Sequence, residues 1–301
     1  MSILSISFFS VEILALILSL MQFYLVVRNR KNIFIASFYR LYIIDSIGNL
    51  LTWLNAVYLL RLSTIVSPTS PFSFLYLGFG EELPRISQSL SYFFAYVQYT
   101  LTATIALNRW SVMVLNPAKY EKIWLSTRAL LTIAGILLVP MFDAGRFFWY
   151  KTTTTFDEEA QQFVFSSEMT LRNQFKFLIF YMPISTAIGL IMNILCFVRY
   201  SKLRSLLSNQ SQRRDGHLAA TSLATCIVQL CGCILSIIRY FGEDKLAESY
   251  LMLILPYVSS TLTWFQSVML FVLSGNMRKE MKKLVLCQKE PTIMVNPANI
   301  H

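Results

Sequence analysis

Long apolar stretches separated by short charged segments repeat along the whole chain. No Asp, Glu, Lys or Arg occurs between Arg85 and Arg109, and none occurs between Lys176 and Arg199. An α-helix needs about 20 apolar residues to cross a hydrocarbon core of about 30 Å. The pattern therefore predicts seven membrane-spanning helices, at about residues 8–27, 38–60, 86–108, 129–150, 176–198, 218–240 and 250–273.

Composition supports this interpretation. Hydrophobic residues make up 55% of the chain and charged residues 14%, whereas soluble domains contain about 25% charged residues. Because the backbone must satisfy its own hydrogen bonds within a bilayer, the spans are expected to be helical. We predict an all-α membrane protein in which residues 1–287 form a seven-transmembrane helix bundle. Residues 288–301 lack apolar periodicity and are predicted to form a disordered cytoplasmic tail.

Lysine and arginine are distributed unevenly among the connecting segments. Eighteen of the 26 basic residues lie in the segments 28–40, 109–128, 199–217 and 278–289. Because such residues are retained on the cytoplasmic side of membranes, we place the N-terminus outside and the C-terminus in the cytoplasm. The net charge of +10 comes mostly from short loops beside spans. It therefore favours contact with membrane lipids over nucleic-acid binding.

The five cysteines do not support an extracellular disulfide. Four of them fall inside the fifth and sixth spans, and Cys287 falls near the C-terminus. Side chains at Cys231 and Cys233 diverge on a helix, so we predict ordinary packing there and no metal site. Cys287 follows a basic amphipathic stretch at 276–286, which makes it a candidate for lipidation by palmitoylation, with an unmodified surface thiol as the alternative.

Polar side chains of the third span gather on one side of the predicted helix. At 100° per residue, Gln88, Tyr92, Tyr96 and Tyr99 share one stripe, and leucine, valine and isoleucine occupy the other side. The tyrosines lie in the outer half of the span, where an external ligand arrives. We predict that this stripe, together with Gln229 in the sixth span, binds ligand. Hydrogen bonding between helices without ligand contact is the alternative.

The second span contains an aspartate. Asp45 shares one helical face with Asn49 and Thr52. A charged residue inside a span costs about 2.5–3.5 kcal/mol on insertion scales, so Asp45 is expected to face protein or water. Since it lies nearer the cytoplasmic side, we predict a role in activation, through conformation or ion binding. A purely structural hydrogen-bond acceptor is the alternative.

The inner end of the third span reads Asn108-Arg109-Trp110. Together with Pro117 and Tyr120 it resembles the Asp-Arg-Tyr region of rhodopsin-like G-protein-coupled receptors. Asn108 replaces the acid of that motif, and the seventh span has no Asn-Pro-x-x-Tyr. The resemblance implies that Asn108, Arg109 and Trp110 take part in G-protein coupling. Because Asn108 offers Arg109 no ion pair, Arg109 is expected either to be restrained more weakly in the resting receptor or to be restrained by another residue.

A second resemblance covers about residues 5 to 290. The chain is similar to nematode serpentine chemoreceptors, especially class gamma and its relatives. The residues that carry this resemblance are Phe38-Tyr39-Arg40-Leu41-Tyr42, Asp45-Ser46, Asn108-Arg109, Pro117, Tyr120 and Ile123-Trp124. It implies a sensory receptor in the plasma membrane, including that of a sensory cilium, which binds a small-molecule or peptide ligand and activates a heterotrimeric G protein.

Other functional classes remain as alternatives. A ligand-gated channel subunit with inverted topology would place the N-terminus inside the cell. A secondary transporter usually contains internal repeats with broken helices, and Pro140, Pro183 and Pro256 do not occupy corresponding positions in two halves. An enzyme is not expected, because neither His217 nor His301 has a suitably spaced acid or cysteine. We therefore predict neither cofactor nor metal.

Overall fold

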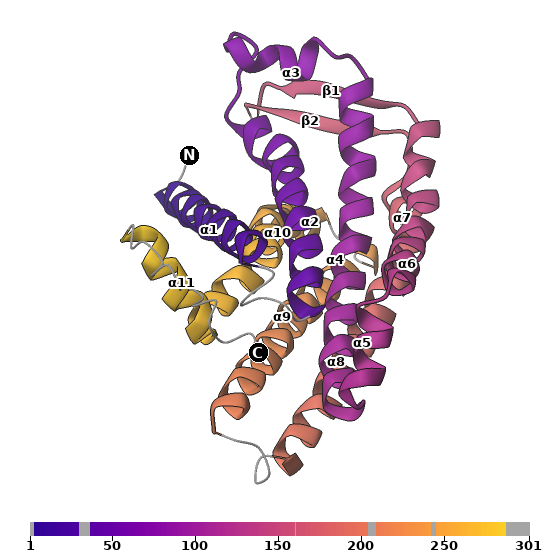
Figure 1. The fold of residues 1–301 in the computed structure, drawn as a ribbon. Coiled ribbons are helices and arrows are strands. Elements are labelled where there is room, and N and C mark those ends of the chain that lie inside the picture. Colours follow the sequence, from indigo (N-terminus) through magenta and orange to yellow (C-terminus); the bar gives the residue numbers. More distant parts are fainter. Residues whose placement is uncertain (1–2, 30–36, 160, 204–208, 242–244, 287–301) are drawn as a thin grey trace.

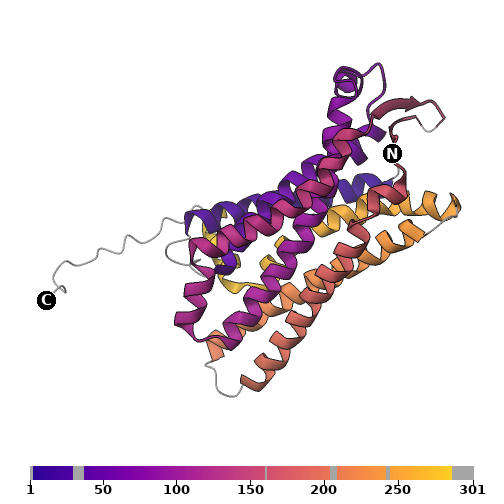
Figure 2. The ribbon, with the colours of Figure 1, turned by 90° about the vertical axis from the view of Figure 1, so that its right-hand side faces the viewer.

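The computed structural model describes residues 3–29, 37–159, 161–203, 209–241 and 245–286. This part of the chain is mostly helical, which confirms the predicted fold class. Figure 1 shows the long helices running alongside one another, and Figure 2 shows the same bundle from the side. The seven long helices are α1 (Ile3–Arg28), α2 (Ser37–Ala56), α4 (Glu82–Val114), α6 (Thr127–Gly145), α8 (Leu178–Leu203), α9 (Asn209–Phe241) and α10 (Lys245–Leu273).

Shorter elements connect the long helices. A π-helical turn, η1 (Val57–Arg61), continues α2. The remaining connections are η2 (Leu62–Thr64), η3 (Pro71–Ser73), α3 (Phe74–Leu77), α5 (Pro117–Trp124), η4 (Arg146–Trp149), β1 (Thr152–Asp157), β2 (Gln162–Ser167) and α7 (Leu171–Phe175). A further short helix, α11 (Gly275–Val285), follows α10.

Most of the long helices are apolar enough to cross a membrane. Within the described residues, five helices meet this condition by length and composition, or six if the bent pair of α10 and α11 counts as one span. The central helix α4 is not among them, although it has 33 residues. Its buried positions include Ser, Thr, Gln and Tyr side chains. These polar groups lower its hydropathy, and they are tolerated because neighbouring helices cover them.

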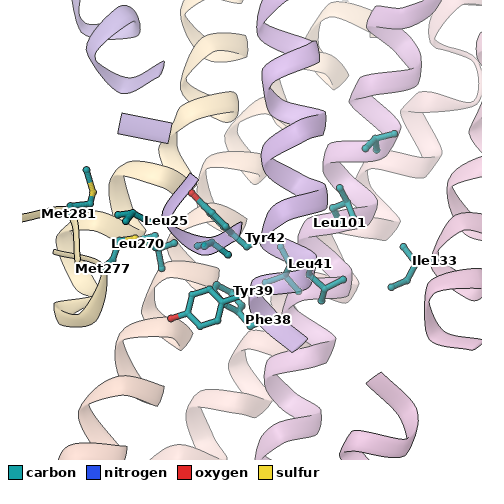
Figure 3. Packing of buried hydrophobic residues seen from close by; sticks show 13 residues of the cluster. Leu25, Phe38, Tyr39, Leu41, Tyr42, Leu101, Ile133, Leu270, Met277 and Met281 are labelled. Atoms are coloured by element: carbon teal, nitrogen blue, oxygen red, sulfur yellow. The ribbon is translucent and has the colours of Figure 1, made fainter. Parts of the chain in front are cut away.

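Helix α4 holds the bundle together. It packs against α2, α6, α8 and α9, and Leu101 in its inner half is completely buried. A hydrophobic cluster around Leu101 also contains Leu25, Tyr42, Leu270 and Met277, which come from four other helices (Figure 3). This cluster fixes the end of the bundle that the charge distribution assigns to the cytoplasm.

The chain turns by 92° between α10 and α11. The Ser274 hydroxyl accepts a hydrogen bond from the Met277 amide over 3.3 Å and so caps the first turn of α11. Met277 and Met281 are buried against the cluster of Figure 3, whereas Arg278 and Lys279 are exposed. The basic amphipathic stretch expected at 276–286 is therefore a helix whose apolar face packs on the bundle.

A β-hairpin covers the opposite end of the bundle, beside α3 (Figure 1). Thr152 pairs with Ser167, and the antiparallel register continues to Asp157 and Gln162. The prediction of an all-α chain missed this hairpin. Its signal was the β-branched run at 152–155 and the Phe-Val-Phe run at 163–165, because β-branched and aromatic residues favour strands.

Aromatic rings attach the hairpin to the connection between α2 and α4. The Tyr76 ring lies between Tyr58 and Phe163, with ring centroids 5.1 Å and 4.6 Å apart and nearly parallel planes. The Tyr76 hydroxyl donates to the Tyr58 carbonyl oxygen over 2.8 Å. Burial of the ring raises the pKa of the Tyr76 phenol above its usual value. This stack is a noncovalent attachment at the end of the bundle whose connecting segments contain no cysteine.

Candidate ligand-binding and signalling residues

The outer half of α4 meets α6 and α7 through two tyrosines. The Tyr92 hydroxyl donates to Gln174 Oε1 of α7 over 2.8 Å, and the Tyr92 ring stacks on Phe147 with centroids 4.3 Å apart. The Tyr96 hydroxyl donates to Asp143 Oδ2 of α6. Asp143 also forms an ion pair with Arg146 one turn further along. Both hydroxyls therefore form hydrogen bonds that join α4 to neighbouring helices.

Tyr99 and Gln229 connect α4 with α9. The Tyr99 hydroxyl donates to the Gln229 carbonyl oxygen over 3.1 Å. The Gln229 side-chain nitrogen donates to the Gln98 carbonyl oxygen over 3.0 Å and to the Thr102 hydroxyl over 2.7 Å. Tyr99 is 2% exposed and Gln229 is 3% exposed. The structure thus places these two predicted site residues together in a closed interface.

Gln88 lies nearer the outer end of the same helix, where it meets the hairpin. Its side-chain oxygen accepts a hydrogen bond from the Thr152 hydroxyl of β1 over 3.2 Å. Gln88 is partly buried and Thr152 is buried. The polar side chains of the predicted stripe on α4 therefore contact the hairpin, α7, α6 and α9 in turn. Each of these side chains has a hydrogen-bond partner within the protein.

Asp45 belongs to a chain of hydrogen bonds between α2 and α4. Asn49 donates from Nδ2 to Asp45 Oδ2 over 2.8 Å, and Gln98 donates from Nε2 to Asn49 Oδ1 over 2.9 Å. Asp45 is 3% exposed. The expectation that Asp45 and Asn49 share an inward face is confirmed by this geometry. Only the tertiary structure identifies Gln98 as the residue that continues the chain.

The inner end of α4 is buried beside α2. The Arg109 guanidinium carbon lies 3.9 Å from the centroid of the Phe38 ring, which is a cation–π contact. The Asn108 side-chain nitrogen donates to the Tyr120 hydroxyl of α5 over 3.2 Å. Asn108 and Arg109 are 0% and 5% exposed, and Trp110 is partly buried. The structure thus joins Arg109 to an aromatic residue of the Phe38-Tyr39-Arg40 segment.

Sequence reasoning missed a buried ion pair at the outer end of the bundle. Arg61 Nη2 donates to Glu12 Oε1 over 2.8 Å, and Glu12 is 1% exposed. A regular helix would turn Arg61 about 160° away from Asp45. The π turn η1 adds about one residue to its turn and so changes the direction of the Arg61 side chain by about 100°. In this direction Arg61 reaches Glu12 of α1. An acid and a base at similar depth in the first two spans were the available signal.

A second missed network ties α1, α2 and α10 together near the cytoplasmic end. The Tyr42 hydroxyl donates to Gln22 Oε1 over 2.6 Å, and Gln22 Nε2 donates to the Ser267 carbonyl oxygen over 2.9 Å. All three residues are buried. The lipidation candidate Cys287 and the predicted tail at 288–301 lie outside the described residues.

Comparison with known proteins assigns the chain to a family. Residues 6–281 match the Srg family chemoreceptors, a match that covers nearly all of the described bundle. No curated protein matches the chain. Members of this family are multi-pass membrane receptors without catalytic activity. With its helical bundle and its membrane-length helices, the chain belongs to the Srg family of nematode seven-transmembrane serpentine chemoreceptors.

Proposed function

We propose that this Srg chemoreceptor binds a small-molecule or peptide ligand outside the cell and activates a heterotrimeric G protein in the cytoplasm. The observation that carries the proposal is that one helix, α4, holds both the candidate ligand-binding tyrosines and the candidate coupling residue Arg109. Its outer half holds the tyrosines bonded to α6, α7 and α9, and its inner end holds Arg109 against α2. A ligand that prefers one arrangement of these contacts shifts the population of the whole bundle toward that arrangement.

Ligand contact is proposed for Gln88, Tyr92, Tyr96, Tyr99 and Gln229. In the described arrangement each of these side chains already bonds within the protein. A ligand must therefore replace an internal partner. Replacing the bond between Tyr96 and Asp143 changes how α4 meets α6, and this exchange links binding to helix movement.

Coupling is proposed for Asn108, Arg109 and Trp110, with Asp45 as a conformational element. The contact of Arg109 with Phe38 supplies the resting interaction that an acid at position 108 provides in the rhodopsin-like motif. Separation of α4 from α2 would release the guanidinium toward a bound G protein. The hydrogen bonds from Asp45 through Asn49 to Gln98 join the same two helices deeper in the bundle.

The finer assignments follow the sequence resemblance. We propose membership of class gamma among the serpentine receptors, and residence in the plasma membrane, including the membrane of a sensory cilium. The N-terminus and the hairpin then face outward, and α11 lies at the inner leaflet. Cys287 would add a lipid anchor directly after α11.

Ligand-stimulated nucleotide exchange tests the proposal. Membranes that contain only this receptor and a purified G protein are screened with a panel of chemicals. The exchange measurement is then repeated with the active compound on the Arg109→Ala variant. We expect Arg109→Ala to abolish exchange at unchanged receptor abundance. Lys119→Ala is the matched control, because Lys119 is an exposed cation of the adjacent helix α5.

Two outcomes would contradict the coupling mechanism. Exchange at the wild-type rate in Arg109→Ala would remove Arg109 from the mechanism. Compound uptake or ion current in the same membranes, without nucleotide exchange, would favour a transporter or a channel subunit instead.

A further inference from the structure

A crevice of about 90 Å³ lies between α1, α2 and α10, away from the stripe of tyrosines on α4. Its walls are mostly apolar and include Leu16, Phe23 and Leu50. Leu20 and Ile47, which also line it, are each 45% exposed on the outside of the bundle. In a membrane this outer side meets lipid, so a compound dissolved in the bilayer can reach the crevice.

Four buried polar atoms without a hydrogen-bond partner among the described residues belong to residues that line this crevice. They are Glu12 Oε2, Ser46 Oγ, Trp53 Nε1 and Trp264 Nε1. The other oxygen of Glu12 accepts from Arg61, so the carboxylate keeps its charge balanced while Oε2 stays available. Buried polar groups are normally paired, because water no longer solvates them.

These atoms define a hydrogen-bonding pattern. Each indole N–H can only donate, and the carboxylate oxygen can only accept. Glu12 and Trp53 also line a second cavity of about 10 Å³ together with Arg61 and Ser260, which places both residues at one end of the crevice. A hydroxyl group matches this end, since its oxygen accepts and its proton donates.

We propose that the crevice binds a small aliphatic alcohol taken up from the bilayer. The hydroxyl oxygen accepts from an indole N–H, the hydroxyl proton is donated to Glu12 Oε2, and the alkyl chain packs against the leucines and Phe23. A ketone of the same length can only accept, and an alkane does neither. Affinity therefore decreases from alcohol to ketone to alkane, by about tenfold for loss of the hydrogen bond to the carboxylate.

Fluorine NMR on receptor labelled with 5-fluorotryptophan in lipid nanodiscs tests this site. The chain has five tryptophans, and single Trp→Phe variants assign their signals. Titration with 1-hexanol, 2-hexanone and hexane is expected to shift the Trp53 and Trp264 signals at the lowest concentration for hexanol. Because the sample contains no G protein, the result is independent of the exchange experiment above.

Three variants separate the hydroxyl contacts from general effects. Trp53→Phe, followed through the Trp264 signal, is expected to weaken hexanol binding about tenfold and to leave hexane binding unchanged. Trp124→Phe is the matched control, because its indole nitrogen is also buried without a partner among the described residues but lies on α5, outside the crevice. Ser19→Leu fills the crevice without removing any of the four polar atoms, and it is expected to abolish the hexanol-induced shifts.

The proposal is overturned by either of two results. If hexane shifts the Trp53 and Trp264 signals at concentrations equal to or below those of hexanol, the polar atoms make no contact with the ligand. Equal shifts of all five tryptophan signals would show that the alcohol acts on the bilayer as a whole.

Discussion

Arg61 at the end of η1 donates a hydrogen bond to Glu12 of α1 over 2.8 Å, and both side chains are buried at the outer end of the bundle. The guanidinium also lies 5.6 Å and 5.2 Å from the ring centroids of Phe8 and Tyr257. This one cation therefore joins α1, α2 and α10.

Breaking this ion pair is expected to destabilise the receptor strongly. Arg61→Met leaves the Glu12 carboxylate buried without its cation, which costs about 3–5 kcal/mol. The double variant Glu12→Gln with Arg61→Met removes both charges and is expected to melt closer to the wild type than Arg61→Met does. Thermal unfolding of four purified proteins, namely the wild type, Glu12→Gln, Arg61→Met and the double variant, measures this coupling. Additive losses in the double variant would show that the two residues do not interact.

The aromatic stack is expected to hold the outer hairpin in place. Tyr76→Ala removes the ring between Tyr58 and Phe163, a loss of about 3–5 kcal/mol for a large aromatic residue. Hydrogen exchange of the amides in β1 and β2 should then accelerate. Tyr76→Phe removes only the hydroxyl bond and should cost about 1 kcal/mol. Phe72→Ala is the control, because Phe72 belongs to the same connection and is 58% exposed. If Phe72→Ala accelerated hydrogen exchange in β1 and β2 as much as Tyr76→Ala does, the aromatic stack would not be what holds the hairpin.

Alkaline pH is expected to weaken the same stack. Burial raises the pKa of Tyr76, so the folded protein keeps the phenol proton where the unfolded chain releases it. The unfolded state then binds fewer protons, and stability falls as the pH rises above about 10. Melting temperatures of the wild type and Tyr76→Phe, compared between about pH 8 and about pH 11, check this. A constant difference between the two proteins would contradict it.

Tyr96 and Tyr99 are expected to differ in their contribution to stability. The Tyr96 hydroxyl bonds to a carboxylate, and hydrogen bonds to charged groups contribute about 1.5–3 kcal/mol. The Tyr99 hydroxyl bonds to a neutral carbonyl, for which about 0.5–1.5 kcal/mol is typical. Tyr96→Phe should therefore lower the melting temperature more than Tyr99→Phe does. The reverse order would show that the bond between Tyr96 and Asp143 contributes little to the resting bundle.

Phe38→Leu is expected to raise basal G-protein activation. A desolvated cation–π contact contributes about 2 kcal/mol, so its loss favours release of Arg109 by up to about 30-fold. Nucleotide exchange without ligand measures the effect. Phe142→Leu is the matched control, because Phe142 is 83% exposed on α6. Unchanged basal exchange in Phe38→Leu would mean that Phe38 does not restrain Arg109.

Helical periodicity was sufficient to predict which side chains share a face. Asp45 and Asn49 are four residues apart and do form a hydrogen bond, because residues at this spacing are neighbours on any helix. The same rule identified α11, whose methionines are buried and whose lysines are largely exposed. It did not show that Tyr96 bonds to Asp143, since that contact depends on the rotation and depth of α6.

The sequence by itself determined the class of protein, because membrane spans and charge asymmetry are properties of short segments. It also determined the family, through motifs at the ends of α2 and α4 and a match over residues 6–281. Only the tertiary structure decided which polar groups meet across helices. Glu12 bonds to Arg61 across 49 positions of sequence, and Arg61 lies at the end of the π turn η1. Local periodicity determines on which face of its helix a side chain lies. The partner of that side chain depends on how the whole helices pack against one another.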